Sequence, residues 1–291
     1  RPRWIFNPPM QNLHTHTRYS DGSSPPEAYL HAAAGLGLHS LGFSDHSPLP
    51  FANTFALREE KLREYCDSIL SIKHFATSLP HHPAIFLGLE ADFIPGMGHP
   101  FRYYRDNFPI DYLIGSVHLV RNGSAGELWF IDGPDPATYD EGLERLFAGD
   151  IRQAVTAYYR QINEMIASGG LDVVGHLDKI KMHNRGRLFR EDEPWYVRLV
   201  DETLEQVKKA GIIAEVNTRG IYKKRSDTHF PGPWVLERMH RLGIPVTIAS
   251  DAHRPEELAK LFPETAGLLK SVGFRETMVL TAGGWIPVPL L

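Results

Sequence analysis

The stretch NLHTHTRYSDG, residues 12–22, places His14 and His16 two positions apart and Asp21 five residues further along the chain. Side chains at positions i and i+2 of an extended strand leave the same face, so both imidazoles can converge on one point. A metal ion is one ligand that such a pair can hold. The stretch therefore predicts a strand that ends in a polar site.

Around this stretch, short apolar runs of strand length alternate with segments of helical length and pattern. Prolines at the starts of several helical segments and glycines at their ends, as in KKAGI and HRLGI, support the boundaries. Strands that alternate with helices indicate βαβ units around a parallel sheet, and thus an α/β fold. The expected strands fall within residues 11–16, 40–46, 85–93, 111–118, 171–178, 212–217, 245–253 and 277–282, and the expected helices within residues 25–38, 57–78, 136–168, 194–210, 233–242 and 255–272.

Histidines, carboxylates and one amide collect at the same end of the expected strands. In a closed α/β barrel the carboxyl ends of the strands meet on one face, where the active sites of such folds are built. Placement at the same end of so many strands predicts a single site on that face. The residues at or just after the strand ends are His14, His16, Asp45, His46, Glu90, His118, His176, Asp178, Glu215, Asn217, Asp251 and His253.

The 291 residues contain no internal repeat, low-complexity tract or break in composition that marks a linker, so we predict one domain. Residues 10–291 are expected to form it, and residues 1–9 are set aside as an N-terminal extension. Residues 121–136, RNGSAGELWFIDGPDP, have the character of an ordered insertion after a strand.

The composition is that of a globular enzyme, since 42% of the residues are hydrophobic and 23% are charged, and this excludes a disordered chain. A formal net charge of -4 gives no reason to expect a nucleic-acid partner. The single cysteine, Cys66, cannot form an internal disulfide, and no apolar run is long enough to span a membrane. We therefore expect a cytoplasmic protein without a membrane partner.

Two i, i+2 pairs frame the expected site: His14 with His16 near the start of the chain, and Asp251 with His253 near its end. Imidazoles and carboxylates together suit divalent ions such as zinc, manganese or iron, and the lack of clustered cysteines argues against a structural thiolate site. One histidine at a strand end is usually a hydrogen-bonded structural residue. Two such pairs indicate a metal centre.

Six motifs follow one another over nearly the whole chain: HTHTRYSDG, GFSDHSPLPF, GLEADFIPG, GSVH, GHLDKIK and SDAH. As a set they resemble the polymerase and histidinol phosphatase (PHP) family, and the contexts SDHSPLPF and GLEADFI are similar to its histidinol-phosphatase branch. The resemblance implies a distorted (β/α)7 barrel, like a TIM barrel, with the active site at the C-terminal ends of the strands. It also implies two or three bound divalent metals.

The resemblance further implies how nine ligands divide among the ions. The first metal takes His14, His16, Glu90 and Asp251, the second takes Asp21, His46 and His253, and the third takes His118 and His176, with Glu90 as a bridge. The family fills the position of Asp21 with either histidine or an acidic residue, so this ligand follows a looser pattern than the other eight.

The implied reaction is the hydrolysis of L-histidinol phosphate to L-histidinol and phosphate, a late step of histidine biosynthesis. Divalent ions neutralise phosphate oxygens and lower the pKa of a bridging water. We therefore expect a metal-bridging hydroxide to attack phosphorus in line, without a protein nucleophile. In this scheme Glu90, Asp251 and His253 are the catalytic residues.

A phosphate ester also needs cationic partners on the protein. Arg219, in EVNTRG, follows a strand end and can bond two phosphate oxygens at once. Three further basic side chains are candidates for substrate binding, each with a solvated surface charge as its alternative: Lys181, Arg185 and Arg254.

Other interpretations stay open. A PHP phosphoesterase could act on another phosphomonoester, such as a sugar phosphate or a nucleotide. An amidohydrolase also carries two histidines in its first strand, but it usually needs a lysine at a middle strand, where Glu90 stands. A non-catalytic PHP-like domain that docks to a polymerase would tend to lose ligands, whereas all nine positions hold competent ones. The sequence also leaves open the choice of metals and a homo-oligomer.

Overall fold

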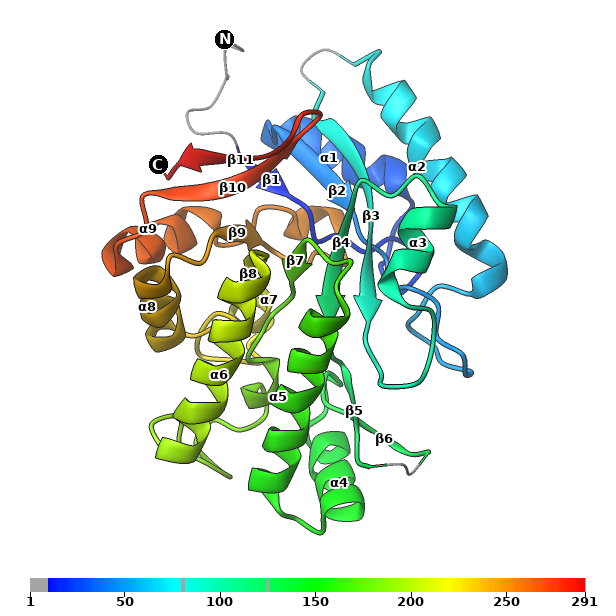
Figure 1. Cartoon of the computed structure of the whole chain (residues 1–291). Coiled ribbons are helices and arrows are strands. Elements are labelled where there is room, and N and C mark those ends of the chain that lie inside the picture. The colour runs from blue at the N-terminus through cyan, green and yellow to red at the C-terminus, as the bar shows by residue number, and fades with distance from the viewer. Residues whose placement is uncertain (1–9, 80–81, 124–125, 291) are drawn as a thin grey trace.

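A seven-stranded parallel sheet forms the centre of the molecule (Figure 1). The computed structural model describes residues 10–79, 82–123 and 126–290, so the predicted extension of residues 1–9 lies outside the described part. The strand order is β1-β2-β3-β4-β7-β8-β9, and all neighbours pair in parallel. These strands are β1 (Gln11–Asn12), β2 (Ser40–Phe43), β3 (Ala84–Asp92), β4 (Tyr112–Ser116), β7 (Val173–Val174), β8 (Ile213–Asn217) and β9 (Val246–Ala249).

Helices surround the sheet, and two antiparallel hairpins lie outside it (Figure 1). Among the described residues, none of these helices has both the length and the apolarity that a membrane crossing needs. The helices are α1 (Pro26–Leu36), α2 (Leu62–Ala76), α3 (Phe101–Asn107), α4 (Pro136–Phe147), α5 (Ile151–Ser168), α6 (Pro194–Ala210), α7 (Arg219–Tyr222), α8 (Pro233–Leu242) and α9 (Phe262–Val272). The hairpins are β5 (Leu119–Arg121) with β6 (Leu128–Phe130), and β10 (Glu276–Thr281) with β11 (Gly284–Pro289).

The two edges of the sheet meet at their carboxyl ends, and this contact closes the barrel. The backbone N–H of His16 donates to the carbonyl of Ala252 at 2.8 Å, and that of Ala252 donates to the carbonyl of His14 at 3.0 Å. The distorted, seven-stranded α/β barrel implied by the sequence motifs is thereby confirmed.

Two predicted helical segments differ from the structure. Residues 136–168 form two helices, because Ala148 and Gly149 adopt left-handed φ angles of 50° and 75° and break the hydrogen-bond ladder. Asp150 then starts α5, since its carboxylate accepts a hydrogen bond from the backbone N–H of Gln153 at 3.0 Å. Residues 255–272 begin with a single 3₁₀ turn, and the α-helix follows only from Phe262.

Tyr112 of β4 fills the interior of the barrel. Its side chain is fully buried, and its hydroxyl donates a hydrogen bond to the carbonyl of Leu13. A Cβ atom at Gly42 would lie 2.3 Å from the Tyr112 hydroxyl oxygen, and one at Gly88 would lie 2.4 Å from its ring. Only glycine leaves this space. The barrel is therefore a packed core, and function is confined to its ends.

The β10–β11 hairpin covers the end of the barrel at which the strands begin (Figure 1). The amide of Gln11, at the start of β1, donates to the carbonyl of Met278 at 2.9 Å and accepts from the N–H of Leu280 at 3.0 Å. The hydroxyl of Thr247 in β9 also donates to Met278. The predicted polar residues gather at the opposite end.

Candidate metal centre

Glu90, near the end of β3, lies at the middle of a group of imidazoles. Its Oε2 lies 3.1 Å from His14 Nε2, 3.3 Å from His16 Nε2 and 3.3 Å from His46 Nδ1. All four side chains are buried. Because parallel neighbours bring their carboxyl ends together, residues that follow β1 and β2 reach the same carboxylate oxygen.

The other oxygen of Glu90 faces two further histidines. Its Oε1 lies 3.3 Å from His118 Nε2 and 3.0 Å from His176 Nε2. Asp92, two residues beyond Glu90 on the same face of β3, accepts a hydrogen bond from His118 Nδ1 at 2.9 Å, which turns His118 Nε2 toward Glu90. Sequence reasoning missed Asp92, although its i+2 spacing from Glu90 is a signal that could have found it.

The segment after β9 completes the cluster from the other edge of the sheet. Asp251 Oδ1 lies 3.4 Å from His16 Nε2 and 3.7 Å from His14 Nε2. His253 Nε2 lies 3.1 Å from Asp21 Oδ2, and Asp21 Oδ1 lies 3.6 Å from His16 Nδ1. Residues from opposite ends of the chain therefore share one site.

All nine predicted ligands belong to groups in which several donor atoms could share an ion. Within each group the donor atoms lie within 4.8 Å of one another. The groups are His16, Asp21, His46 and His253; His14, His16 and Asp251; His46, Asp92 and His118; and Glu90, His118 and His176.

Several buried donor atoms of this cluster have no hydrogen-bond partner among the described residues. They are His14 Nε2, His16 Nδ1 and Nε2, His46 Nδ1, Asp92 Oδ2 and His176 Nδ1. Buried polar atoms are nearly always paired, because each unmet group costs about 1–3 kcal/mol. Divalent cations coordinate imidazole nitrogen and carboxylate oxygen together. The donor set therefore fits divalent metals.

Buried neighbours fix the orientation of the candidate ligands. Glu215 of β8 accepts hydrogen bonds from His14 Nδ1 and, at 2.9 Å, from the backbone N–H of His176. The amide of Asn217 donates to Glu215 Oε2 at 3.1 Å and to Asp251 Oδ2 at 3.2 Å. His14 Nε2 and Asp251 Oδ1 consequently stay turned toward the cluster.

Asp45, at the end of β2, holds the turn that carries Asp21. Its buried carboxylate accepts hydrogen bonds from the backbone N–H of Thr17 at 2.8 Å and from the hydroxyl of Ser20 at 2.7 Å. Asp45 thus acts on the site through the loop.

The charges of the cluster favour cations. Burial raises the pKa of Glu90 and Asp251, but the neighbouring imidazoles, His14 first, outweigh it and hold both values well below their usual range. Burial lowers the pKa of His16, yet the adjacent carboxylates of Asp251 and Glu90 raise that value to about 9. Carboxylates that stay ionised in a buried pocket create a field that attracts metal ions.

Arg219 is the one predicted substrate-binding residue that the described structure places against a candidate ligand. It is the first residue of α7, directly after β8, and its Nη1 donates to the carbonyl of Asp251 at 2.8 Å. The same nitrogen lies 3.4 Å from the Tyr222 hydroxyl and 3.5 Å from Glu257 Oε2. Attraction to Asp251 raises the pKa of Arg219 against the effect of burial, so the guanidinium is a fixed positive charge beside the cluster.

The other three predicted substrate-binding residues are not brought to the cluster by a contact. Lys181 is buried and its Nζ lies 2.7 Å from Asp178 Oδ2. The side chains of Arg185 and Arg254 are exposed by 48% and 61%. Arg185 donates to the carbonyl of Lys224 at 2.9 Å.

Lys179 and Asp132 form an ion pair at the edge of the cluster that sequence reasoning missed. Lys179 Nζ lies 2.7 Å from Asp132 Oδ1, and Asp132 Oδ2 lies 3.7 Å from His118 Nε2. Burial lowers the pKa of Lys179, but attraction to Asp132, Asp251 and Glu90 outweighs it and raises the value. A permanent cation therefore lies beside the candidate ligands. The motif GHLDKIK contains this lysine, and its position two residues before Lys181 gave no reason to prefer it.

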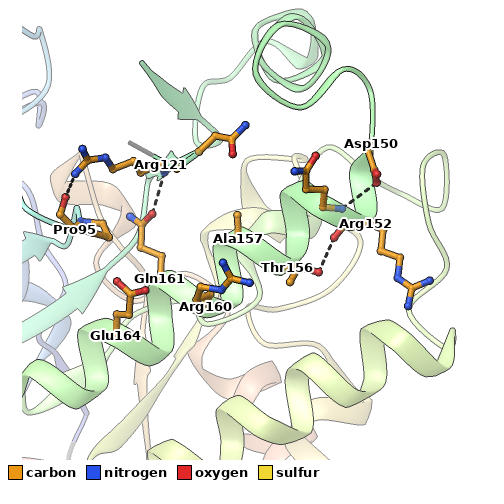
Figure 2. A pocket seen from close by; sticks show the side chains of 12 residues that line it. Pro95, Arg121, Asp150, Arg152, Thr156, Ala157, Arg160, Gln161 and Glu164 are labelled. Atoms are coloured by element: carbon orange, nitrogen blue, oxygen red, sulfur yellow. Dashed lines mark hydrogen bonds between the residues drawn. The ribbon is translucent and has the colours of Figure 1, made fainter. Parts of the chain in front are cut away.

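A groove of about 520 Å³ lies outside the barrel, behind the segments that follow β3 and β4 (Figure 2). Gln161 of α5 lies in its wall, and its side-chain amide donates to the carbonyls of Phe93 at 2.6 Å and Leu119 at 2.8 Å. Its Oε1 accepts a hydrogen bond from the backbone N–H of Arg121 at 3.0 Å (Figure 2). One buried side chain thus ties three backbone segments together.

Replacement of Gln161 by leucine should weaken the support of the metal centre, because Gln161 holds Phe93 and Leu119, which directly follow Asp92 and His118. Carbonyls left unpaired in the interior should lower the free energy of unfolding by about 2–3 kcal/mol, measured by urea denaturation. Gln153→Leu, at an exposed position on the same helix and in the same groove, is the control and should change the free energy of unfolding little. Equal stability of the two variants would contradict the bracing role.

Known proteins share this architecture and sequence. The PHP domain family matches residues 12–219. A Deinococcus radiodurans protein named probable histidinol-phosphatase is 31% identical over 267 residues, which covers 90% of this chain and 93% of that protein. The histidinol-phosphatase of Bacillus subtilis is 26% identical over 258 residues, or 83% of this chain and 92% of that protein.

A solved structure extends the likeness to the fold. The histidinol phosphate phosphatase of Lactococcus lactis, complexed with zinc, L-histidinol and phosphate, superposes with a TM-score of 0.69 and 19% identity. The match covers 95% of this chain and 98% of that one. Since the family match spans more than half of the sequence and the barrel agrees with it, this chain belongs to the PHP domain family.

Proposed function

We propose that this protein is a metal-dependent histidinol-phosphatase, which hydrolyses L-histidinol phosphate to L-histidinol and phosphate. The observation that carries the proposal is the convergence of nine imidazole and carboxylate side chains around Glu90. Two curated relatives that bear the name histidinol-phosphatase align along more than four fifths of both chains, which supports the same substrate here. The domain that does this work is proposed to be residues 10–291.

We infer that the cluster holds two or three divalent ions. The zinc in the Lactococcus lactis complex supports zinc, and the same nitrogen and oxygen donors also accept manganese or iron. When bound, such ions neutralise charge on phosphate oxygens and lower the pKa of water, which is the chemistry that phosphomonoester hydrolysis needs. Glu90, Asp251 and His253 are proposed to be the catalytic members of the ligand set.

The neighbouring side chains are proposed to fix the orientation of the metal ligands. Asp92 and Glu215 hold the Nδ1 atoms of His118 and His14, so that each Nε2 faces the cluster. Asp251 has a left-handed φ of 52°, and the bond from Arg219 to its carbonyl holds the backbone in this uncommon conformation. These groups need not move during the reaction, which favours a preorganised site.

Arg219 and Lys179 are proposed to bind the phosphate group. Among the described residues, Arg219 contacts Tyr222, Asp251 and Glu257 through Nη1, so Nη2 and Nε remain for phosphate oxygens. Lys179 adds a charge from the end of the neighbouring strand, β7. Binding of substrate by Lys181, Arg185 and Arg254 stays a prediction, as do a cytoplasmic location and a homo-oligomer.

The proposal is tested by the purified protein on a panel of phosphomonoesters. We expect kcat/KM for L-histidinol phosphate to exceed that for glucose 6-phosphate and for AMP by roughly 100-fold or more, because a site built for one leaving group leaves polar groups unpaired with another. Phosphate release is the measurement. Equal efficiency on all three esters would remove the named substrate and favour a general phosphoesterase, whereas no release from any of them would favour a docking domain.

A further inference from the structure

Two phenylalanines, Phe55 and Phe130, stack on each other beside the metal centre. Their ring centroids are 5.7 Å apart and their planes differ by 12°. Both side chains are half-buried, so part of this aromatic surface faces solvent. Phe55 comes from the loop between β2 and α2, and Phe130 ends β6, in the hairpin that lies beyond the ends of β3 and β4 (Figure 1). We call this stacked pair the aromatic wall.

The aromatic wall contacts one candidate metal ligand, His46, through Phe55. The ring of His46 packs edge-on against Phe55, with centroids 5.3 Å apart and an angle of 82° between the planes. His46 in turn lies 5.1 Å from the ring of His118. Two residues after Phe130, Asp132 reaches to 3.7 Å from His118 Nε2. The wall therefore stands at the border of the site.

Backbone hydrogen bonds hold both halves of the aromatic wall in place. The side chain of Asn53 accepts hydrogen bonds from the N–H groups of Phe55 at 3.1 Å and Ala56 at 2.7 Å, which fixes the loop. Phe130 pairs with Leu119 in the hairpin, and the next residue, Ile131, donates to the carbonyl of His118 at 3.0 Å. A partly exposed apolar surface that is held this firmly suits a rigid ligand.

Nothing in metal binding or phosphate binding requires such a surface. A flat aromatic or heteroaromatic ring does, because it packs on phenyl groups by stacking or by edge contacts. The leaving group of L-histidinol phosphate carries an imidazole ring. A ring that packs on the aromatic wall would leave the phosphate end of the molecule free to reach the cluster.

We propose that the aromatic wall of Phe55 and Phe130 binds the imidazole ring of the leaving group and thereby selects an aromatic amino-alcohol phosphate over one without a ring. This inference rests on the proposed function and adds the part of the site that distinguishes substrates. It assigns no chemical step to either phenylalanine. The aromatic wall should therefore affect the ratio of kcat/KM between two substrates that share the phosphate and the amine and differ in the ring.

The test compares L-histidinol phosphate with 2-aminopropyl phosphate, which has the same amino-alkyl phosphate without the ring. The wild-type protein should prefer the first by roughly 10- to 200-fold in kcat/KM, as expected for an apolar group in a pocket. In the Phe55→Ala/Phe130→Ala double variant this preference should largely disappear through a loss on L-histidinol phosphate alone. Phe75→Ala, at a phenyl group on α2 that is 46% exposed, is the matched control and should leave both efficiencies unchanged.

Three outcomes would overturn the assignment. The double variant could keep the wild-type preference, or it could lose equally on both substrates, which would make the wall purely structural. Hydrolysis of neither substrate by the wild-type protein would remove the proposed function itself, and the assignment with it. If the alanine variant does not fold, Phe55→Leu/Phe130→Leu keeps apolar volume without the flat rings, and an unchanged preference there would equally count against the proposal.

Discussion

Glu90→Gln should strip the protein of its metal and reduce phosphate release by roughly 1,000-fold or more, the scale on which preorganised charge contributes to catalysis. The substitution changes one oxygen to an amide nitrogen and keeps the shape of the side chain. Its effect is large because both carboxylate oxygens are in use: Oε2 faces His14, and Oε1 faces His176 at 3.0 Å. An amide has a donor on one side, so it cannot serve cations on both.

Metal content after dialysis and the rate of phosphate release are the two measurements for Glu90→Gln. Glu215→Gln is the matched control, since Glu215 is also a buried strand-end carboxylate, and the candidate ligands that it contacts among the described residues are His14 and His176. Its loss should be smaller, roughly 10- to 100-fold, as for residues that orient a ligand. A fully metallated and active Glu90→Gln protein would refute the metal centre as described.

Lys179→Met should lower kcat/KM by roughly 100-fold while the metal content stays unchanged, because one cation of the phosphate site is lost and no metal ligand is removed. The affinity for inorganic phosphate, measured by equilibrium dialysis, should fall in parallel. The variant also leaves Asp132 without its partner at 2.7 Å. A loss of activity alone could therefore reflect a displaced Asp132.

The double variant Asp132→Asn/Lys179→Met separates these causes. It removes both charges, so no unpaired carboxylate remains at position 132. The free energy of unfolding should then be close to that of the wild-type protein, while the affinity for inorganic phosphate stays low. Recovery of both the stability and the phosphate affinity would mean that the Lys179–Asp132 ion pair is structural, and it would contradict phosphate binding by Lys179.

Lys181→Met provides the contrast: its buried partner Asp178 is left without its cation, so the free energy of unfolding should fall by about 3–5 kcal/mol. A greater loss of phosphate affinity in Lys181→Met than in Lys179→Met would restore the assignment made from the sequence.

The location of the site at the strand ends could be predicted from two simple sequence patterns. Alternating strands and helices dictate a parallel sheet, and the i, i+2 spacing of His14 with His16 dictates a shared face. The structure brings both histidines to Glu90. Residues 136–168 are helical as predicted, but the break between α4 and α5 was not predicted, because the left-handed turn at Ala148 uses backbone angles that its residue type disfavours.

The motif did not predict which lysine lies beside the cluster, paired with Asp132. Lys179 and Lys181 lie in the same 3₁₀ turn, and which of them faces the cluster depends on the direction in which the chain leaves β7. Lys179 pairs with Asp132, which is distant in sequence, whereas Lys181 pairs with Asp178, three residues before it. The aromatic wall could not be predicted from the sequence either, since Phe55 and Phe130 are brought together by tertiary structure.

The seam between the first and last strands of the sheet has a consequence for biosynthesis. His16 and Ala252 join the two edges by a hydrogen bond, and Asp251 beside the seam meets both His14 and His16. A ribosome that has made about four fifths of the chain has therefore produced the five histidines that face Glu90, but neither Asp251 nor His253 from across the seam. The nascent protein can gather only an incomplete set of ligands, and full affinity for cations must await the arrival of its final strands.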